Sequence, residues 1–296
     1  MTRIRLLGVL LLTGLSAFSQ NIHVGVFTAI SAYQGDLTDR IFPKKVTNGA
    51  IGFTVNYELA PQIMLRGGFT YTVVGGADRY SNDDSLRARN LAFETHITEF
   101  SAVGEYYFFD LNEQKFSPYV FGGLAVFHFN PYDYNGTTQK IFLKPLSTEG
   151  EGLSAYPSRK PYALTQLAIP FGGGVKYAFN DRLRLGLELG LRKLFTDYLD
   201  DVSTTYVDPN DLLAAKGQLA VDMSYRGDEV AGGNPNYPSK GAQRGGSKHK
   251  DSYYFLGLHL TYRLGTGENT NRSGVFGGGN YKGGRKRGYG CPAVNH

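Results

Sequence analysis

The residues best suited to acid–base chemistry are the histidines, which are His23, His96, His128, His249, His259 and His296. A hydrolytic site needs one of them beside a nucleophile and a third group that orients the imidazole. His23 and His259 lie on the polar faces of the first and last alternating runs, so they approach each other if those runs are neighbours. No serine of matching phase stands beside either one. We therefore interpret both as polar filling and predict no catalytic residue and no cofactor, with a lipid- or peptide-modifying enzyme as a minor alternative.

Oxygen ligands gather at one further place. Asp197, Asp200 and Asp201, followed by Asp208, form an acidic segment. Carboxylates of this kind bind Ca²⁺, but their spacing does not match an EF-hand loop. The three acids from Asp197 to Asp201 are therefore weak calcium candidates, and solvated loop acids are the more common interpretation. The triplet Gly172-Gly173-Gly174 does not make a nucleotide-binding fingerprint and is typical of close backbone packing within a strand.

The composition excludes several classes of protein. Cys291 is the sole cysteine, so an internal disulfide framework and a Cys-cluster zinc or iron–sulfur site are ruled out. The 296 residues include 39 Gly, 21 Tyr and 19 Phe, and the glycine share is almost double the usual ~7%. The mean hydropathy of −0.28 does not exclude a membrane protein, because a transmembrane β-barrel carries apolar residues only at alternate positions.

The N-terminal segment resembles a secretory signal. Arg3 and Arg5 precede an apolar run over residues 6–15 and a small-residue stretch over 16–19. We expect residues 1–19 to be a signal peptide, with Gln20 as the first mature residue and no lipoprotein anchor. No later segment approaches the ~20 apolar residues that a membrane-spanning helix requires.

Eight runs of residues alternate between apolar and polar side chains. They cover 22–30, 51–59, 63–73, 99–108, 116–129, 166–179, 183–192 and 254–264. The seventh run is the clearest, with leucine at every second position, whereas the fifth is apolar on both faces and its phase is ambiguous. Many apolar faces finish in Tyr or Phe, as in an aromatic girdle, and short links alternate with long ones. The pattern predicts an all-β fold over residues 20–264: an eight-stranded antiparallel transmembrane β-barrel of OmpA/OmpX-like size with long outer loops. A soluble β-sandwich is the alternative.

The polar faces predict what fills such a barrel. The inward charged set consists of Glu58, Arg66, Glu99, Glu105, Lys176, Arg184, Glu188, Arg192 and Arg263, with His259 among them. An eight-stranded barrel has an interior that side chains can fill, and buried charges are tolerated when they are paired. We expect a neutralising ion-pair network that plugs the lumen rather than a pore, with a proton or ion path as the alternative.

After Leu264 the alternation stops. Residues 265–296 are rich in glycine and carry Arg272, Lys282, Arg285, Lys286 and Arg287 against one acid, Glu268. We interpret this segment as a flexible basic periplasmic tail that docks to a partner, with Cys291 available for an intermolecular disulfide. An unstructured solubilising tail is the alternative. Nucleic-acid binding is not expected in the periplasm.

Several segments together resemble the PorG family of the type IX secretion system, an outer-membrane family also catalogued as a domain of unknown function. They are Tyr33-Gln34-Gly35-Asp36-Leu37, Pro118-Tyr119-Val120-Phe121-Gly122-Gly123 with His128-Phe129-Asn130-Pro131, and Asp197-Tyr198-Leu199-Asp200-Asp201-Val202-Ser203. The resemblance covers residues 21–264. It implies an integral component of the Gram-negative outer membrane, and the even number of predicted strands places both termini in the periplasm. It also implies association with a periplasmic ring of a PorK-like lipoprotein and a PorN-like protein.

The same resemblance implies a role in exporting proteins that carry a C-terminal signal, and in some bacteria in gliding. It supplies no catalytic residues. Outer-membrane lipid, the ring proteins and other type IX outer-membrane components are the expected partners. The alternative function is an outer-surface binding or adhesion barrel that acts through its long extracellular loops.

Overall fold

A computed structural model describes residues 21–38, 46–136, 138–248 and 250–265 of the chain. The predicted signal peptide, residues 1–19, lies outside this part. The proposed partner-binding residues of the tail also lie outside it, and these are Lys282, Arg285, Lys286, Arg287 and Cys291.

Eight long strands close into an antiparallel barrel, which confirms the predicted fold class. They are β1 (Ile22–Gln34), β2 (Asn48–Ala60), β3 (Ile63–Ala77), β4 (Ala92–Tyr107), β5 (Phe116–His128), β8 (Thr165–Ala178), β9 (Leu183–Leu194) and β10 (Ser252–Arg263). Each strand pairs with the next, and β10 pairs with β1 over a register that runs from His23 opposite Arg263 to Gln34 opposite Ser252. Closure leaves the barrel without a free sheet edge.

Alternation along each strand decides which side chains face inward. In β9, Glu188 and Arg192 are buried, whereas Leu187 and Leu189 are 48% and 45% exposed on the outer wall. Exposed apolar residues recur on all sides of the barrel, and such a band requires lipid rather than water around it. The ambiguous phase of β5 resolves in the same way, because Tyr119 points inward and Leu124 outward. The described residues contain no helix of the length and apolarity needed to cross a membrane.

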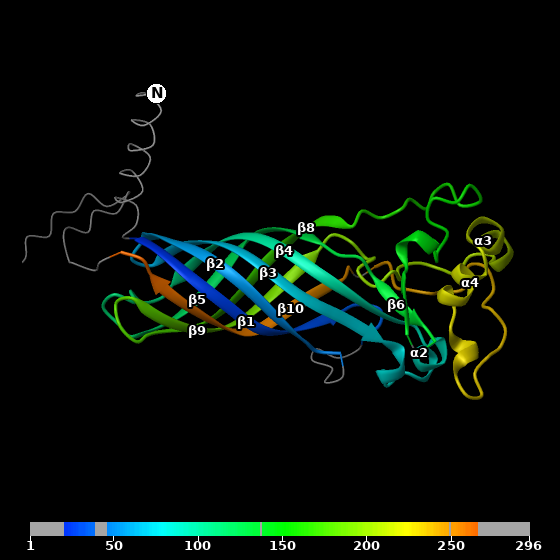
Figure 1. The fold of residues 1–296 in the computed structure, drawn as a ribbon, viewed down its shortest axis with the longest axis horizontal. Helices are drawn as coiled ribbons and strands as arrows, with labels where there is room; N and C mark the ends of the chain where they lie inside the picture. Colours follow the sequence, from blue (N-terminus) through cyan, green and yellow to red (C-terminus); the bar gives the residue numbers. More distant parts are fainter. Residues whose placement is uncertain (1–20, 39–45, 137, 249, 266–296) are drawn as a thin grey trace, which may run out of the picture.

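Exposed aromatic residues ring one end of this band. They are Tyr106, Phe108, Phe116, Tyr177, Phe179 and Tyr262. The short links of the chain join β2 to β3, β4 to β5 and β8 to β9 at this end (Figure 1). The two ends of the barrel sequence meet there as well, since the Leu264 amide donates to the Ile22 carbonyl over 2.9 Å.

The four long connections meet at the opposite end of the barrel and form what we call the cap, the described residues of 35–47, 78–91, 129–164 and 195–251 (Figure 1). Its elements are η2 (Asp78–Tyr80), α2 (Asp84–Arg89), β6 (Tyr132–Asn135), β7 (Gln139–Phe142), η3 (Lys144–Leu146), α3 (Pro209–Lys216), α4 (Gln218–Ser224) and η4 (Gly227–Glu229). β6 and β7 form a hairpin beside β4. The sequence predicts long loops here, and the structure shows that those loops fold.

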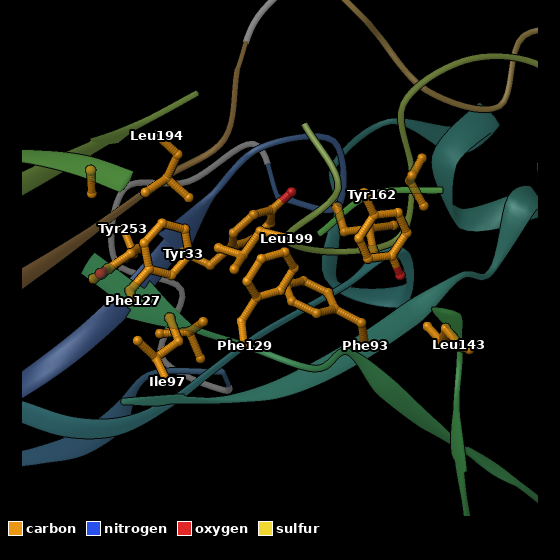
Figure 2. Packing of buried hydrophobic residues seen from close by; sticks show 14 of the residues in the cluster. Tyr33, Phe93, Ile97, Phe127, Phe129, Leu143, Tyr162, Leu194, Leu199 and Tyr253 are labelled. Carbon is orange, nitrogen blue, oxygen red and sulfur yellow. The ribbon is translucent and has the colours of Figure 1, made fainter. Parts of the chain in front are cut away.

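A hydrophobic core runs from the barrel mouth into the cap (Figure 2). Four rings stack in series: Phe127 on Phe129 at 5.5 Å between centroids, Phe129 on Tyr162 at 6.1 Å, and Tyr162 on Tyr198 at 4.9 Å. Leu199 packs in the same core and is fully buried. This continuous packing fixes the cap on the barrel, because burying each such side chain contributes about 1.5–3 kcal/mol.

Candidate functional site

The centre of the lumen is organised around Arg66 of β3. Its Nε lies 3.1 Å from a Glu105 carboxylate oxygen, and its Nη1 lies 2.5 Å from Glu188. Lys176 contacts the second oxygen of Glu105 at 3.2 Å, and the Tyr119 hydroxyl donates to Glu188 over 2.7 Å. All five side chains are buried. Two cations therefore balance two carboxylates in one hydrogen-bonded layer.

Two further charged layers lie on either side of that centre. Toward the cap, Arg192 binds Glu99 at 3.1 Å. Toward the short turns, Glu58 lies 3.5 Å from Arg184 and 3.3 Å from Arg263. The structure thus places all nine charged residues of the predicted network inside the barrel, each in an ion pair. These layers fill an interior that is only wide enough for side chains.

The two inward histidines do not form a catalytic arrangement. His23 contacts Glu58 at 3.3 Å, and His259 contacts the Thr54 hydroxyl at 2.7 Å. They are linked only indirectly, since Asn56 donates to both the His23 carbonyl and the Thr54 hydroxyl. Arg66 lies 3.3 Å from Nδ1 of His259, and an arginine only donates. This assigns the His259 proton to Nε2, so the ring donates to Thr54 and is unable to accept its proton as a general base would.

Glu105, Glu188 and His259 also bring ligand atoms within 4.8 Å of one another, as a metal site would require. Arg66 contacts all three residues, so a guanidinium already supplies the positive charge. We therefore interpret this trio as part of the ion-pair plug.

The acidic segment is buried in the cap, so its interpretation as solvated loop acids is wrong. Asp197, Asp200 and Asp201 are between 1% and 3% exposed. Their carboxylates turn to different partners: Asp197 to Ser203 at 2.7 Å, Asp200 to Tyr33 at 2.6 Å, and Asp201 to Thr148 and Tyr162 at 2.5 and 2.6 Å. Among the residues that the structure describes, these three do not converge as a metal-ligating group. Asp208 lies apart from them and caps α3 through the Asn210 amide at 2.9 Å.

Arg244 joins the cap loops and was not predicted from the sequence. It is 2% exposed, lies 3.1 Å from a Glu149 carboxylate oxygen, and donates to the backbone carbonyls of Asp201 at 2.6 Å and Ser224 at 3.2 Å. The Glu149 carboxylate also accepts from the amides of Ser203 and Thr204. A single buried guanidinium thus connects three distant stretches of chain. The surrounding Gly-rich, polar sequence gave no periodic signal that marks this residue.

The buried carboxyl groups make the cap sensitive to pH. Burial raises the pKa of Asp201 to about 6 despite the nearby Arg244. Burial, with the Asp201 and Glu149 carboxylates close by, raises the pKa of Glu151 to about 8. Burial also raises the pKa of Asp200 and of Asp251 well above the ordinary value, and the two carboxyls share the Tyr33 hydroxyl. The folded cap therefore holds protons that the unfolded cap releases.

We expect the cap to lose stability as the pH rises from about 4 through about 8. The folded pKa of Asp201 and Glu151, about 6 and about 8, lies above the unfolded values of 3.8 and 4.5, so stability is complete at low pH and declines across that window. Amide hydrogen exchange of residues 195–203, corrected for the intrinsic exchange rate, should show stronger protection at pH 5 than at pH 8. Stronger protection at pH 8 would contradict this assignment.

Motif residues far apart in the chain meet in the cap core. Tyr33 of the first motif donates to Asp200 of the third over 2.6 Å, and Phe129 of the second stacks on Tyr162. Tyr162 in turn donates to Asp201 of the third motif. Residues of all three motifs thus meet where the cap attaches to the barrel, whereas residues 118–123 of the second motif lie in the short-turn half of β5.

Comparison with known proteins gives a family match over part of the chain. Residues 3–144 match the model of a domain of unknown function, DUF6089. No curated protein matches the chain.

Solved structures resemble the chain at low identity. Neisserial surface protein A is 10% identical with a TM-score of 0.40, covering 82% of this chain and 96% of that one. OprG from Pseudomonas aeruginosa is 9% identical with a TM-score of 0.39, covering 83% and 97%. The attachment invasion locus protein Ail of Yersinia pestis is 10% identical with a TM-score of 0.36, covering 82% and 99%. The closed strand ladder of this chain itself establishes the barrel.

Proposed function

We propose that this protein is a non-enzymatic component of a type IX secretion machine in a Gram-negative outer membrane, and of the gliding machinery in bacteria that glide. The observation that carries the proposal is the convergence of the three motifs. Tyr33 and Phe129 lie in one core, and Asp201 accepts from the Tyr162 hydroxyl of that core, although each of the three comes from a separate motif. Part of each motif behind the resemblance to the PorG family therefore belongs to one structural unit.

The lumen supports a holding role over transport or catalysis. Its charged side chains are paired in three layers around Arg66, Glu99 and Glu58. His259 donates to Thr54 and is not placed as a base. A rigid, plugged barrel of this kind suits a protein that fixes other components at the membrane.

We place the short turns and both chain termini in the periplasm and the cap outside the cell. Short periplasmic turns and longer outer connections are usual in outer-membrane barrels. In this orientation the tail after Leu264 reaches the periplasm, where its basic residues would hold a PorK-like and PorN-like ring. Other type IX outer-membrane proteins are further proposed partners.

Deletion of the gene should abolish bulk secretion of proteins with the C-terminal signal, and the full chain should restore it. A tagged full chain, extracted in gentle detergent, should retain the ring proteins, whereas a chain ending at Leu264 should lose them while still forming the barrel. Cys291→Ser should remove any cross-linked band on a non-reducing gel. Normal secretion in the deletion strain would contradict the proposal.

The alternative is an outer-surface binding or adhesion protein. The specific observation in its favour is that the cap has its own second core, which includes Leu153, Tyr156, Val207 and Leu212. Deletion would then change adhesion and leave secretion intact, whereas a changed lipid composition would indicate a barrel enzyme.

A further inference from the structure

An aromatic column continues the outer wall of the barrel beyond the apolar band. Tyr71 of β3 bonds to Nδ1 of His96 of β4 over 2.6 Å, and the two rings stack at 5.9 Å. His96 stacks in turn on Tyr132 of β6 at 5.5 Å. The hairpin thereby extends the wall with ordered rings.

Lys140 of β7 completes this column with a positive charge. Its Nζ lies 3.5 Å from the centroid of the Tyr132 ring and 3.5 Å from Nε2 of His96. The Glu94 carboxylate faces the same column and accepts from the Tyr132 hydroxyl over 2.9 Å. Lys140 is exposed, and an ammonium has three donors, so the contact with His96 leaves donors for a ligand. The cation is thus held at one place rather than on a freely moving chain.

The column stands next to the lipid-facing band. Phe100, which is 62% exposed, lies on β4 four residues after His96, roughly 13 Å along the strand toward the short turns. Phe69 pairs with Phe100 and precedes Tyr71 by two residues on the same outer face. Aromatic residues and lysines with this placement occupy the headgroup level of a bilayer.

A groove of about 450 Å³ opens on the same wall. Val126, Leu167 and Phe195 give it an apolar lining, and Thr165 and Gln166 line its cap side. Val126 lies opposite Phe100 in the β4–β5 register, which places the groove beside Phe100, on the short-turn side of the column. An acyl chain on the apolar lining, with the polar part of the lipid on the cap side, fits this arrangement.

We propose that the wall beneath the hairpin binds an anionic lipid of the leaflet at the cap end through its phosphate group and an acyl chain. The phosphate accepts from Lys140 at the headgroup level, and an acyl chain lies over the groove. The occupant is a lipid rather than a protein partner, because the surface is continuous with the lipid-facing band and the cation stands where that band ends. The inference is independent of the proposed role in secretion.

The test reconstitutes the full chain in discs of equal phosphatidylglycerol and phosphatidylcholine and measures the lipids that remain bound after extraction in gentle detergent. The native protein should retain more phosphatidylglycerol than phosphatidylcholine. Lys140→Gln should lower that preference about tenfold, the effect of losing one charge-assisted hydrogen bond. Lys160→Gln, at an exposed lysine elsewhere in the cap, should leave it unchanged.

A gel shift on heating confirms that each variant forms the barrel. Tyr132→Leu, which removes the ring under the ammonium, should also reduce the preference while the lysine remains. Equal retention of both lipids by the native protein, or equal losses in Lys140→Gln and Lys160→Gln, would overturn the proposal.

Discussion

Replacing Arg66 with methionine should destabilise the folded barrel by about 3–5 kcal/mol, the cost of leaving buried charges without their partner. The substitution removes the contacts at 3.1 Å to Glu105 and 2.5 Å to Glu188. Glu105 keeps Lys176, but Glu188 retains only the neutral Tyr119 hydroxyl. Urea unfolding in detergent micelles, followed by the gel shift on heating, measures the loss.

Arg182→Met is the matched control, because Arg182 is exposed in the turn between β8 and β9. The double variant Arg66→Met with Glu188→Gln should recover part of the stability, since it removes the unpaired charge together with its partner. An unchanged unfolding midpoint in Arg66→Met would show that the ion-pair layer does not support the barrel.

Replacing Arg244 with methionine should melt the cap and leave the barrel folded. Glu149 is fully buried, so losing the contact at 3.1 Å leaves a buried carboxylate without a cation, again at about 3–5 kcal/mol. The hydrogen bonds to the Asp201 and Ser224 carbonyls are lost as well. Proteinase K should then cut within residues 195–251, whereas the gel shift on heating should persist.

Lys248→Met serves as the control for Arg244, because Lys248 is an exposed cation four residues further along the same loop. It should stay as resistant to protease as the native chain. A cap that resists cleavage in Arg244→Met, or a barrel that unfolds together with it, would contradict the separate roles of the two parts.

The barrel could be predicted from the sequence because the pattern that specifies each strand lies within that strand. Arg184, Glu188 and Arg192 alternate with leucines, and a period of two fixes which face is inward. The fifth run was ambiguous for a physical reason. Its inward positions hold Phe121, which packs against the Arg66 guanidinium, and Tyr119, whose aromatic ring resembles the lipid-facing residues although its hydroxyl binds Glu188.

The cap could not be predicted because its contacts are distant in sequence and have no period. Tyr33 bonds to Asp200 and Asp251, which lie 167 and 218 residues away. Arg244, which binds the Asp201 backbone carbonyl and the buried Glu149 carboxylate, has no motif around it. The motif over residues 197–203 therefore drew attention to this acidic segment, whereas the buried environment of its acids is evident only from the fold.

The most direct test of the account is the conductance of the purified full chain in a planar lipid bilayer. The paired layers around Glu58, Arg66 and Glu99 predict a barrel that inserts and carries no steady current. Insertion is shown separately by protection of the strands from protease. A stable open channel in the native protein would contradict the plugged lumen, and with it the view that this barrel holds other components rather than conducting.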